Sequence, residues 1–582
     1  MGKGPYMKEI ADLISIGDYE KAQALLEELI KAKGYDDTAA VLDAAIMGEY
    51  YGDREGMWKA IQKGLLYNCR NYELYIMLGN YYLAENQDQS YLCYENAWFH
   101  CDDDEDKRAI AEMLNQFKGQ YKVSVEKVSI VILSYDLLEY TKACIESIRK
   151  TTPECAREIV VVDNGSKDGS VEWLRGQADV ILIENTINRG FPGGCNQGIK
   201  ASSQKSDIFL LNNDTMLPEN ALFWLRMGLY GREKNGAAGS VSNCAGGQVA
   251  VSGIDNVPDM IQFGERTNVP MEHPYENRLF LVGFALLVKR TVMDQVGLLD
   301  EVFFPGNNED VDLGLRILKA GYQNVLCKNS FILHFGSKTF DKDREGYYAA
   351  ASRNRNQINK KWGFDVDYYL HPREDLVKWI QEPSGRAMHI LDVGCGCGAS
   401  MGYLKGIYPN AKVYGTEPVP KAAELASHMG QALCGDVENM DFPWEEEYFD
   451  YIIVGDALEH WMEPENVLKR LGRHLKKEGH IIASLSNLKH YSVILPLLKW
   501  DMFPYSNAGI LDKAHVKMYT GVEVQRLMAR SGYEVEQLDG TKAGEPNEQE
   551  DHLLDGLQRV LGMPTKETFL VYQYIFKAKK SL

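Results

Sequence analysis

The chain has 582 residues, of which 45% are apolar and 25% are charged. These proportions are typical of folded globular proteins and exclude a largely disordered chain, and at about 150 residues per domain the length predicts three or four domains. The 63 basic and 83 acidic side chains give a formal net charge of −20, which argues against binding to a nucleic-acid backbone as the main activity.

The acidic excess is uneven along the chain. Residues 1–122 carry 13 basic and 22 acidic side chains, residues 123–366 carry 27 and 30, and residues 367–582 carry 23 and 31. An anionic ligand would therefore meet the least electrostatic repulsion in the nearly neutral middle segment.

The sequence favours a cytoplasmic protein. Its eleven cysteines include no CxxC pair and no Cys/His cluster of zinc spacing, which is typical of reduced thiols. We find no signal-peptide pattern, and the longest apolar run, residues 279–288, is about half as long as a membrane-spanning helix. We therefore expect no transmembrane segment, which leaves open docking on a membrane surface.

Residues 1–122 have the apolar period of amphipathic helices, for example over residues 22–30. A turn pair recurs at residues 17–18, 52–53 and 86–87, and this period of about 34 residues resembles that of tetratricopeptide repeats. The predicted helical hairpins would form either a lid or dimerisation module, or a groove that binds a protein partner or the acceptor.

From residue 123 the pattern changes to alternating strands and helices. We predict strands at residues 128–133, 159–162 and 208–211, with an amphipathic helix at 138–150. Each predicted strand ends in polar residues, and in an open α/β sheet the ligand crevice lies at the carboxyl ends of the strands.

Polar motifs follow two of these strands. Asp163 and Asn164 come directly after the second strand, in a sequence that also suits a simple turn. A glycine-dense loop starts at Asn188 and would let the backbone approach a ligand closely. Asp214 ends the third strand, where a carboxylate could hold a divalent metal ion.

In this order and spacing, these segments resemble the family-2 glycosyltransferases of the GT-A fold, especially rhamnosyltransferase-like members, over about residues 127–364. The resemblance implies that Asp163 contacts uracil or thymine, so that the donor is a UDP- or TDP-linked sugar. It places the DXD motif at residues 212–214, with Asn212 where the first aspartate often stands. The implied nucleotide-sugar-binding residues are Asp163, Asn164, Asn188, Gly190, Asn196, Asn212 and Asn213.

The resemblance also implies the reacting groups. Asp214 and His334 would bind Mn²⁺ or Mg²⁺, and neutral imidazole is a sound ligand for such a metal. Asp310 would be the general base that takes the proton of the acceptor hydroxyl in an inverting transfer, and Glu309 would orient the acceptor or the sugar. The competing interpretation is that acids at the start of a helix only complement its dipole.

The last segment restarts the alternation with a predicted strand at residues 389–393, which runs into a G-x-G-x-G turn. Glu417 ends the next strand, at 413–416, about 20 residues further on, where a carboxylate can hold ribose hydroxyls. With Asp436 and the runs 449–460 and 479–486, this set resembles the class I methyltransferases over about residues 386–537. The implied S-adenosylmethionine-binding residues are Asp392, Gly394, Gly396, Glu417 and Asp436.

Two histidines are candidates for the base that accepts the hydroxyl proton of the methyl acceptor. His460 follows the Asp-Ala-Leu-Glu stretch of residues 456–459, near the expected sulfonium, and His515 matches a histidine of sugar-associated relatives. Imidazole titrates near neutrality. The sequence does not choose between them.

We therefore expect a multidomain protein with an all-α repeat domain (residues 1–122), a GT-A α/β domain (123–366) and a Rossmann-like methyltransferase domain (367–582). The expected function is bifunctional: sugar transfer to a glycan or glycosylated protein, then methylation of the glycan. One alternative is a methyltransferase that acts on an unrelated substrate. The other is a repeat scaffold with one degenerate catalytic domain, for which Asn212 is the main support.

Overall fold

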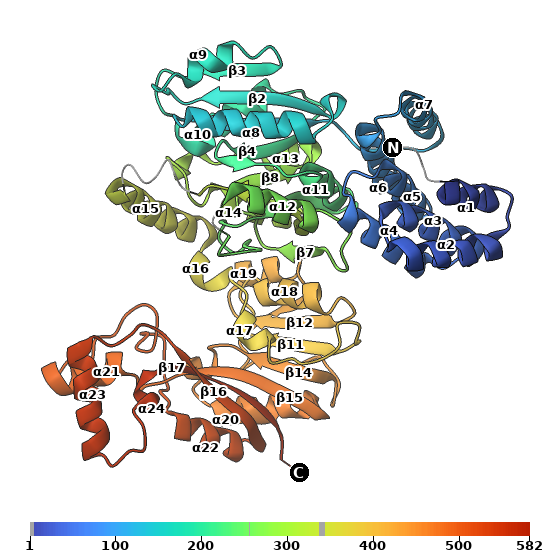
Figure 1. Ribbon diagram of the computed structural model, residues 1–582. Helices are drawn as coiled ribbons and strands as arrows, with labels where there is room; N and C mark the ends of the chain where they lie inside the picture. Colours follow the sequence, from blue (N-terminus) through green and yellow to red (C-terminus); the bar gives the residue numbers. More distant parts are fainter. Residues whose placement is uncertain (1–4, 255, 337–343, 582) are drawn as a thin grey trace. The chain divides into compact units, whose positions relative to one another are not determined.

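The computed structural model describes residues 5–254, 256–336 and 344–581. The chain forms two compact units, Met1–Ile358 and Asn359–Leu582 (Figure 1). None of the helices in the described ranges is long and apolar enough to cross a membrane.

The N-terminal region is helical, as predicted. The three turn pairs separate helices that pack as antiparallel hairpins, so the hairpins are confirmed, although no repeat family is identified in this region. Asp53 and Asn86 begin two of the helices by accepting hydrogen bonds from backbone amides three residues later. The helices are α1 (Pro5–Ser15), α2 (Tyr19–Lys33), α3 (Asp37–Ala45), η1 (Ile46–Tyr50), α4 (Arg54–Tyr67), α5 (Tyr72–Tyr82), α6 (Gln87–His100) and α7 (Asp104–Gln120).

A mixed sheet follows, in the order β3-β2-β1-β4-β8-β6-β9-β7. Strands β3, β2, β1 and β4 are parallel, whereas β8 is antiparallel to both β4 and β6, and β7 is antiparallel to β9. The strands are β1 (Val128–Ser134), β2 (Arg157–Asp163), β3 (Val180–Glu184), β4 (Asp207–Asn212), β6 (Asn235–Val241), β7 (Tyr275–Arg278), β8 (Ala285–Val288) and β9 (Gln323–Phe331), with β5 (Thr215–Met216) paired to β10 (Leu333–His334).

The helices of this sheet connect its strands and cover its faces. They are α8 (Leu138–Thr151), η2 (Glu154–Ala156), α9 (Ser170–Arg175), α10 (Gly190–Ala201), α11 (Ala221–Leu229), α12 (Val257–Thr267), α13 (Arg290–Val296), η3 (Glu301–Phe303), α14 (Glu309–Lys319) and α15 (Arg344–Trp362). The three predicted strands and the predicted helix are confirmed to within two residues at each end.

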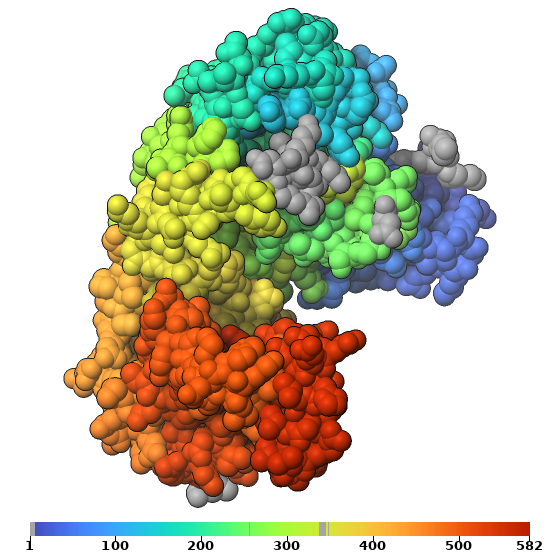
Figure 2. Space-filling model, turned by 90° about the vertical axis from the view of Figure 1, so that its left-hand side faces the viewer, coloured from blue at the N-terminus to red at the C-terminus, as the bar shows by residue number. Residues whose placement is uncertain are grey.

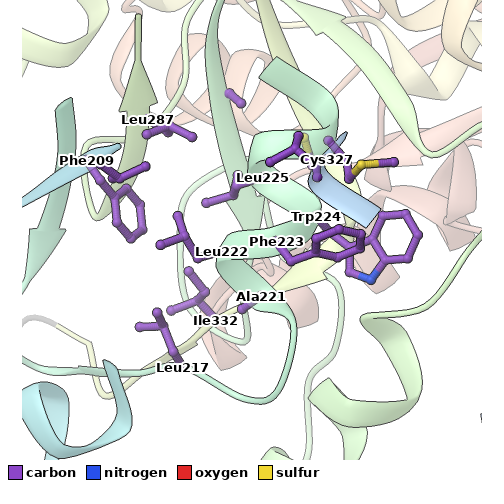
Figure 3. Close-up of a cluster of buried hydrophobic side chains, with 14 of the residues drawn as sticks. Phe209, Leu217, Ala221, Leu222, Phe223, Trp224, Leu225, Leu287, Cys327 and Ile332 are labelled. Carbon is purple, nitrogen blue, oxygen red and sulfur yellow. The ribbon is translucent and has the colours of Figure 1, made fainter. Parts of the chain in front are cut away.

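The helical region shares one hydrophobic core with this sheet. Helix α11 is buried along its whole length, and its side chains pack toward Phe209 and Leu287 of the sheet (Figure 3). The guanidinium of Arg226 in α11 forms a buried ion pair with Glu95 of α6. Asn96 also donates a hydrogen bond to Asn220, over 3.0 Å. The N-terminal helices are therefore part of the first compact unit rather than an independent module.

The second unit has a seven-stranded sheet in the order β13-β12-β11-β14-β15-β17-β16. The first five strands in this order, β13, β12, β11, β14 and β15, are parallel, and β17 is antiparallel to both β15 and β16. The strands are β11 (His389–Val393), β12 (Lys412–Glu417), β13 (Gln431–Cys434), β14 (Phe449–Val454), β15 (Leu475–Ser486), β16 (Tyr533–Lys542) and β17 (Val571–Lys580).

The helices of the second unit are α16 (Val366–Tyr369), α17 (Glu374–Val377), α18 (Ala399–Ile407), α19 (Pro420–Ala426), η5 (Leu458–His460), α20 (Pro464–His474), α21 (Tyr491–Trp500), α22 (Gly521–Arg530), α23 (Glu548–Val560) and α24 (Glu567–Leu570). The predicted order of the three fold types along the chain is thus confirmed.

Candidate active sites

The predicted strand-end residues of the first unit lie at one edge of its sheet. Register pairs Ser134 of β1 with Asp163 of β2, and Leu133 with Asn212 of β4. Asp163 is fully buried, and its Oδ1 accepts hydrogen bonds from the amides of Gly165 and Ser166, over 3.0 and 2.9 Å. Its carboxylate therefore holds the turn after β2 and is fixed at the crevice by that turn.

Asn164 connects this turn to the glycine-dense loop. Its Nδ2 donates to Asn188 Oδ1 and to the carbonyl of Gly190, each over 3.2 Å. Gly190 has φ +72°, and a Cβ atom there would lie 2.9 Å from the carbonyl oxygen of Pro305. Only glycine combines this backbone angle with so close an approach.

Asn196 and Asn213 are hydrogen-bonded within the protein. Asn196 bonds both the amide and the carbonyl of Leu299, over 3.0 and 2.8 Å, and Asn213 Nδ2 donates to Thr141 Oγ1 over 3.0 Å. These contacts account for the burial of both amides without a ligand, so the structure gives no support to their predicted contact with the donor.

Asp214 and His334 come together where β5 pairs with β10. His334 Nε2 lies 3.2 Å from Asp214 Oδ1 and 3.3 Å from Asn212 Nδ2. Its Nδ1 lies 2.6 Å from the carbonyl oxygen of Cys244, an arrangement that holds the ring with Nε2 directed at the carboxylate. Burial would lower the pKa of His334, but the hydrogen bond and the negative charge of Asp214 outweigh burial and raise it.

The pair fits two neighbouring positions of a divalent ion. Two ligand atoms at about 2.1 Å from an octahedral metal are about 3 Å apart, close to the separation of Oδ1 and Nε2. Within the described ranges, however, no cluster of three or more His, Cys, Asp or Glu side chains has the geometry of a metal site. The remaining ligands would therefore have to be diphosphate oxygens or water.

Glu309 and Asp310 begin α14 and differ in their hydrogen bonds. Asp310 Oδ2 accepts a hydrogen bond from the amide of Gly283 over 2.9 Å, and its Oδ1 accepts one from Val311 over 2.8 Å. Glu309 is buried, and its Oε2 has no hydrogen-bond partner among the described residues.

Burial raises the pKa of both carboxyls. The nearby charge of Asp310 raises the pKa of Glu309 further, and backbone hydrogen bonds oppose the rise at both carboxyls. Asp310 differs from Glu309 in that both of its carboxylate oxygens accept hydrogen bonds from backbone amides, and such bonds favour the ionised form that a base requires. The next acid, Asp312, is paired with Arg316 over 2.8 Å on the helix itself.

In the second unit, the turn after β11 has the backbone that a bound ligand needs. Gly394 has φ +74°, and a Cβ atom there would meet only Ala457, at 3.7 Å, so the space beside it is open. Gly396 has φ +55°, and its amide donates to Glu417 Oε2 over 3.0 Å.

The three predicted acids of this crevice have different environments. Burial raises the pKa of Asp392 to about 7 and also raises that of Glu417. Asp436 is exposed and accepts hydrogen bonds from the Glu438 amide and the Asn439 side chain, over 3.0 and 2.8 Å. The first two carboxyls therefore lie beside the glycine turn, and Asp436 shapes the loop after β13.

The structure brings the two candidate histidines together. The ring centroids of His460 and His515 are 4.9 Å apart, with the rings at 71°. Each Nδ1 faces a backbone carbonyl, over 3.2 and 3.0 Å, so the tautomer that donates from Nδ1 keeps Nε2 as a proton acceptor.

Glu459, next to His460, was not identified from the sequence. Its Oε1 accepts a hydrogen bond from the Ser486 amide over 2.6 Å, and its buried Oε2 has no partner in the described part of the chain. Burial, followed by the charge of Asp456, raises the pKa of Glu459 to about 7.

The segment of α16 and α17 was also not identified from the sequence. The carbonyl of Tyr369 accepts a hydrogen bond from the Cys397 amide in the glycine turn, over 3.3 Å. Arg373 contacts Asp456 over 2.7 Å and Asp375 over 2.8 Å. An ion pair between residues as distant in the sequence as Arg373 and Asp456 leaves no pattern by which it could be predicted before the fold is known.

Two family models match parts of the chain. Residues 129–276 match the model "Glycosyl transferase family 2", and residues 391–483 match the model "Methyltransferase domain". The chain carries a family-2 glycosyltransferase domain fused to a methyltransferase domain. Both are enzyme domains, and the second is of the S-adenosylmethionine-dependent type.

Individual relatives match parts of the chain. An N-acetylglucosaminyl-diphospho-decaprenol L-rhamnosyltransferase of Mycobacterium tuberculosis is 26% identical over 250 residues, which are 38% of this chain and 80% of the relative. An uncharacterized protein of Sinorhizobium fredii is 25% identical over 40% of this chain, which spans only 27% of that relative's length. An O-methyltransferase of Penicillium expansum is 32% identical over 101 residues, 16% of this chain and 36% of that protein.

Solved structures give weaker similarities. The structure of GalNAc-T7 with UDP, GalNAc and Mn²⁺ is 14% identical, with a TM-score of 0.30 over 36% of this chain and 44% of that one. A SAM-dependent methyltransferase of Archaeoglobus fulgidus is 14% identical, with a TM-score of 0.28 over 38% of this chain and 98% of that one. Scores of this size are too low to support an argument, so the two family models decide the assignment.

Proposed function

We propose that the chain transfers a sugar from a UDP- or TDP-linked donor to a glycan or glycosylated protein, with inversion, and then methylates the glycan. The observation that carries the first half is the contrast between Glu309 and Asp310 beside the Asp214–His334 pair. Both oxygens of Asp310 accept backbone hydrogen bonds while one oxygen of Glu309 has no partner among the described residues, and a separate carboxylate and imidazole are spaced for one metal ion.

In this proposal Asp310 takes the proton of the acceptor hydroxyl, whose oxygen attacks the anomeric carbon as the bond to the diphosphate breaks. Asp214 and His334 would hold Mn²⁺ or Mg²⁺, which supplies positive charge to the leaving diphosphate. Burial and the charge of Asp310 favour the protonated form of Glu309, which can donate a hydrogen bond to the sugar or the acceptor.

The second unit would bind S-adenosylmethionine at the glycine turn, with Asp392 and Glu417 beside it. S-adenosylmethionine supplies the methyl group. His460 or His515 would accept the proton of the attacking hydroxyl, and their face-to-edge contact makes the two a single candidate proton-accepting pair.

The division into two compact units, each with its own sheet, favours one alternative, in which the methyltransferase acts on an unrelated substrate. The scaffold alternative has less support, because Asp214, Glu309 and Asp310 are present and grouped. We also propose a cytoplasmic location, since every cysteine of the described chain is a free thiol. A protein partner on the helical region would use a face other than the one that covers α11.

The test is a screen of UDP- and TDP-sugars for hydrolysis by the full chain with Mn²⁺, Mg²⁺ or EDTA. Each active donor is then combined with methyl-labelled S-adenosylmethionine and glycan acceptors. We expect hydrolysis that EDTA abolishes, and product that carries both labels. Hydrolysis of no donor would reject the transferase; product that carries sugar but never methyl would favour the unrelated-substrate alternative.

A further inference from the structure

The loop between η3 and α14, which leads into the acidic pair Glu309 and Asp310, carries one exposed aromatic ring. Phe303 is fully buried, but the next side chain, Phe304, is 48% exposed. A single exposed phenylalanine is ordinary on a protein surface. Phe304 differs from that ordinary case because the loop that carries it is bonded on several sides.

Helix α15 fixes this loop from behind. Buried residues recur every four positions along this helix, at Ala350, Asn354 and Ile358. The opposite side of the helix is exposed, on the face of the molecule that Figure 2 shows. Asn354 Nδ2 donates to the carbonyls of Phe303 and Gly306, each over 2.8 Å. The neighbouring guanidinium of Arg353 donates to the carbonyl of Phe304.

The front of the loop contacts the glycine-dense loop. The amide of Phe191 donates to the carbonyl of Pro305 over 2.6 Å, and a Cβ atom on Gly190 would lie 2.8 Å from Cδ2 of Phe304. A Cβ atom on Gly283 would meet Asp310 Cβ at 3.5 Å and Phe191 Cε1 at 3.6 Å. The ring of Phe304 thus lies on the glycine-dense loop, and Phe191 connects that loop to Asp310.

We propose that Phe304 is an acceptor-binding residue, whose exposed ring forms the apolar wall against which the sugar ring of the acceptor packs. The proposal rests on the proposed sugar transfer. An acceptor must place a hydroxyl at Asp310, so its ring lies beside that carboxylate, where Phe304 is the exposed aromatic side chain of the loop. Binding sites combine such apolar walls with a few convergent polar groups, here Glu309 and Asp310.

Asn354 is the positioning residue of this subsite. It cannot contact the acceptor because it is fully buried. The hydrogen bonds of its side-chain amide fix the backbone on both sides of Phe304. A ring held in place loses little conformational entropy when it binds a ligand, which favours affinity.

The test measures transfer to methyl glycosides of glucose, N-acetylglucosamine and rhamnose, with the full chain and the donor that the hydrolysis screen identifies. We expect Phe304→Ala to raise the acceptor KM about five- to tenfold more than the donor KM, the effect of losing one aromatic contact. Phe304→Tyr keeps the aromatic ring, so its acceptor KM should stay within about twofold of the original value.

Val302→Ala is the matched control, because Val302 is 50% exposed and lies two residues earlier; it should change neither constant. Equal rises of both KM values in Phe304→Ala, or the same effect in Val302→Ala, would overturn the proposal. Transfer only to octyl glycosides would assign the ring to an aglycone instead of a sugar and would also overturn it. Absence of donor hydrolysis in the unmodified chain would instead reject the proposed transferase itself.

Discussion

Replacement of Asp310 by asparagine tests the assignment of the base most directly. The amide has nearly the same shape, and its oxygen can still accept a hydrogen bond from Gly283 or Val311 in place of the two that the carboxylate accepts over 2.9 and 2.8 Å. What it loses is the capacity to take a proton. A positioned general base contributes about 10²–10⁴ in rate, so we expect kcat to fall by about that factor while S-adenosylmethionine affinity is unchanged, since that site is in the other compact unit.

The pH dependence gives a second measure of the same residue. Burial raises the pKa of Asp310, and the base acts only when ionised, so activity should be present above this raised pKa and be lost as the pH falls through it. The acidic limb should disappear in Asp310→Asn. The assay is sugar transfer at saturating donor from pH 4 to 9, with Asp294→Asn, an exposed aspartate of α13, as the control. Near-normal transfer by Asp310→Asn, or an unchanged acidic limb, would refute the assignment.

Three further predictions concern the cofactor turn, the shared core and the buried acid. Gly394→Arg should abolish S-adenosylmethionine binding in calorimetry and leave sugar transfer intact, because the open space beside Gly394 would be filled; unaltered binding would contradict the placement. Glu95→Gln should lower the free energy of unfolding of the first unit by about 3–5 kcal/mol, because it leaves the buried Arg226 charge unpaired. The control Glu85→Gln, at an exposed ion pair, should lower it by less than about 1 kcal/mol. Equal losses in thermal or urea unfolding would refute this. Because the pKa of Glu309 is raised in the folded state, the folded protein binds more protons than the unfolded chain above pH 4.5, and its stability falls as pH rises. Glu309→Gln should therefore have the same melting temperature as the original chain near pH 4.5 and a higher one by pH 8. The same dependence of melting temperature on pH in both chains would contradict this.

The central parallel strands of each sheet could be predicted from sequence because they are largely buried on both faces, whereas the outer strands β3 and β13 are partly exposed and were not predicted. Residues 130–133 and 208–211 are continuous apolar runs followed by polar residues, and this pattern marks both the strand and its functional end. Strands β6 and β8 gave no such signal. Ala237 and Ala238 of β6 are small residues in a glycine-containing strand, and β8 is part of a longer apolar run that has no strand-specific ends.

The catalytic acids could be named from sequence, but the reason they act differently could not. Glu309 and Asp310 are adjacent, so no pattern separates them; the distinction comes from Gly283, which lies more than 25 residues earlier in the chain and donates its amide to only one of them. The same holds for Asn354, whose partners lie about 50 residues upstream. Hydrogen bonds between distant segments carry no periodicity, and their assignment requires the fold.

The two units therefore place their chemistry by a common physical means. In each, a buried carboxyl of the candidate site has an oxygen with no hydrogen-bond partner in the described structure, Glu309 in one unit and Glu459 in the other. Burial of such a group costs free energy unless it is protonated or meets a partner. A bound hydroxyl or sugar that supplies the missing hydrogen bond would recover part of that cost, so both orphan oxygens favour binding of a polar substrate over an apolar one.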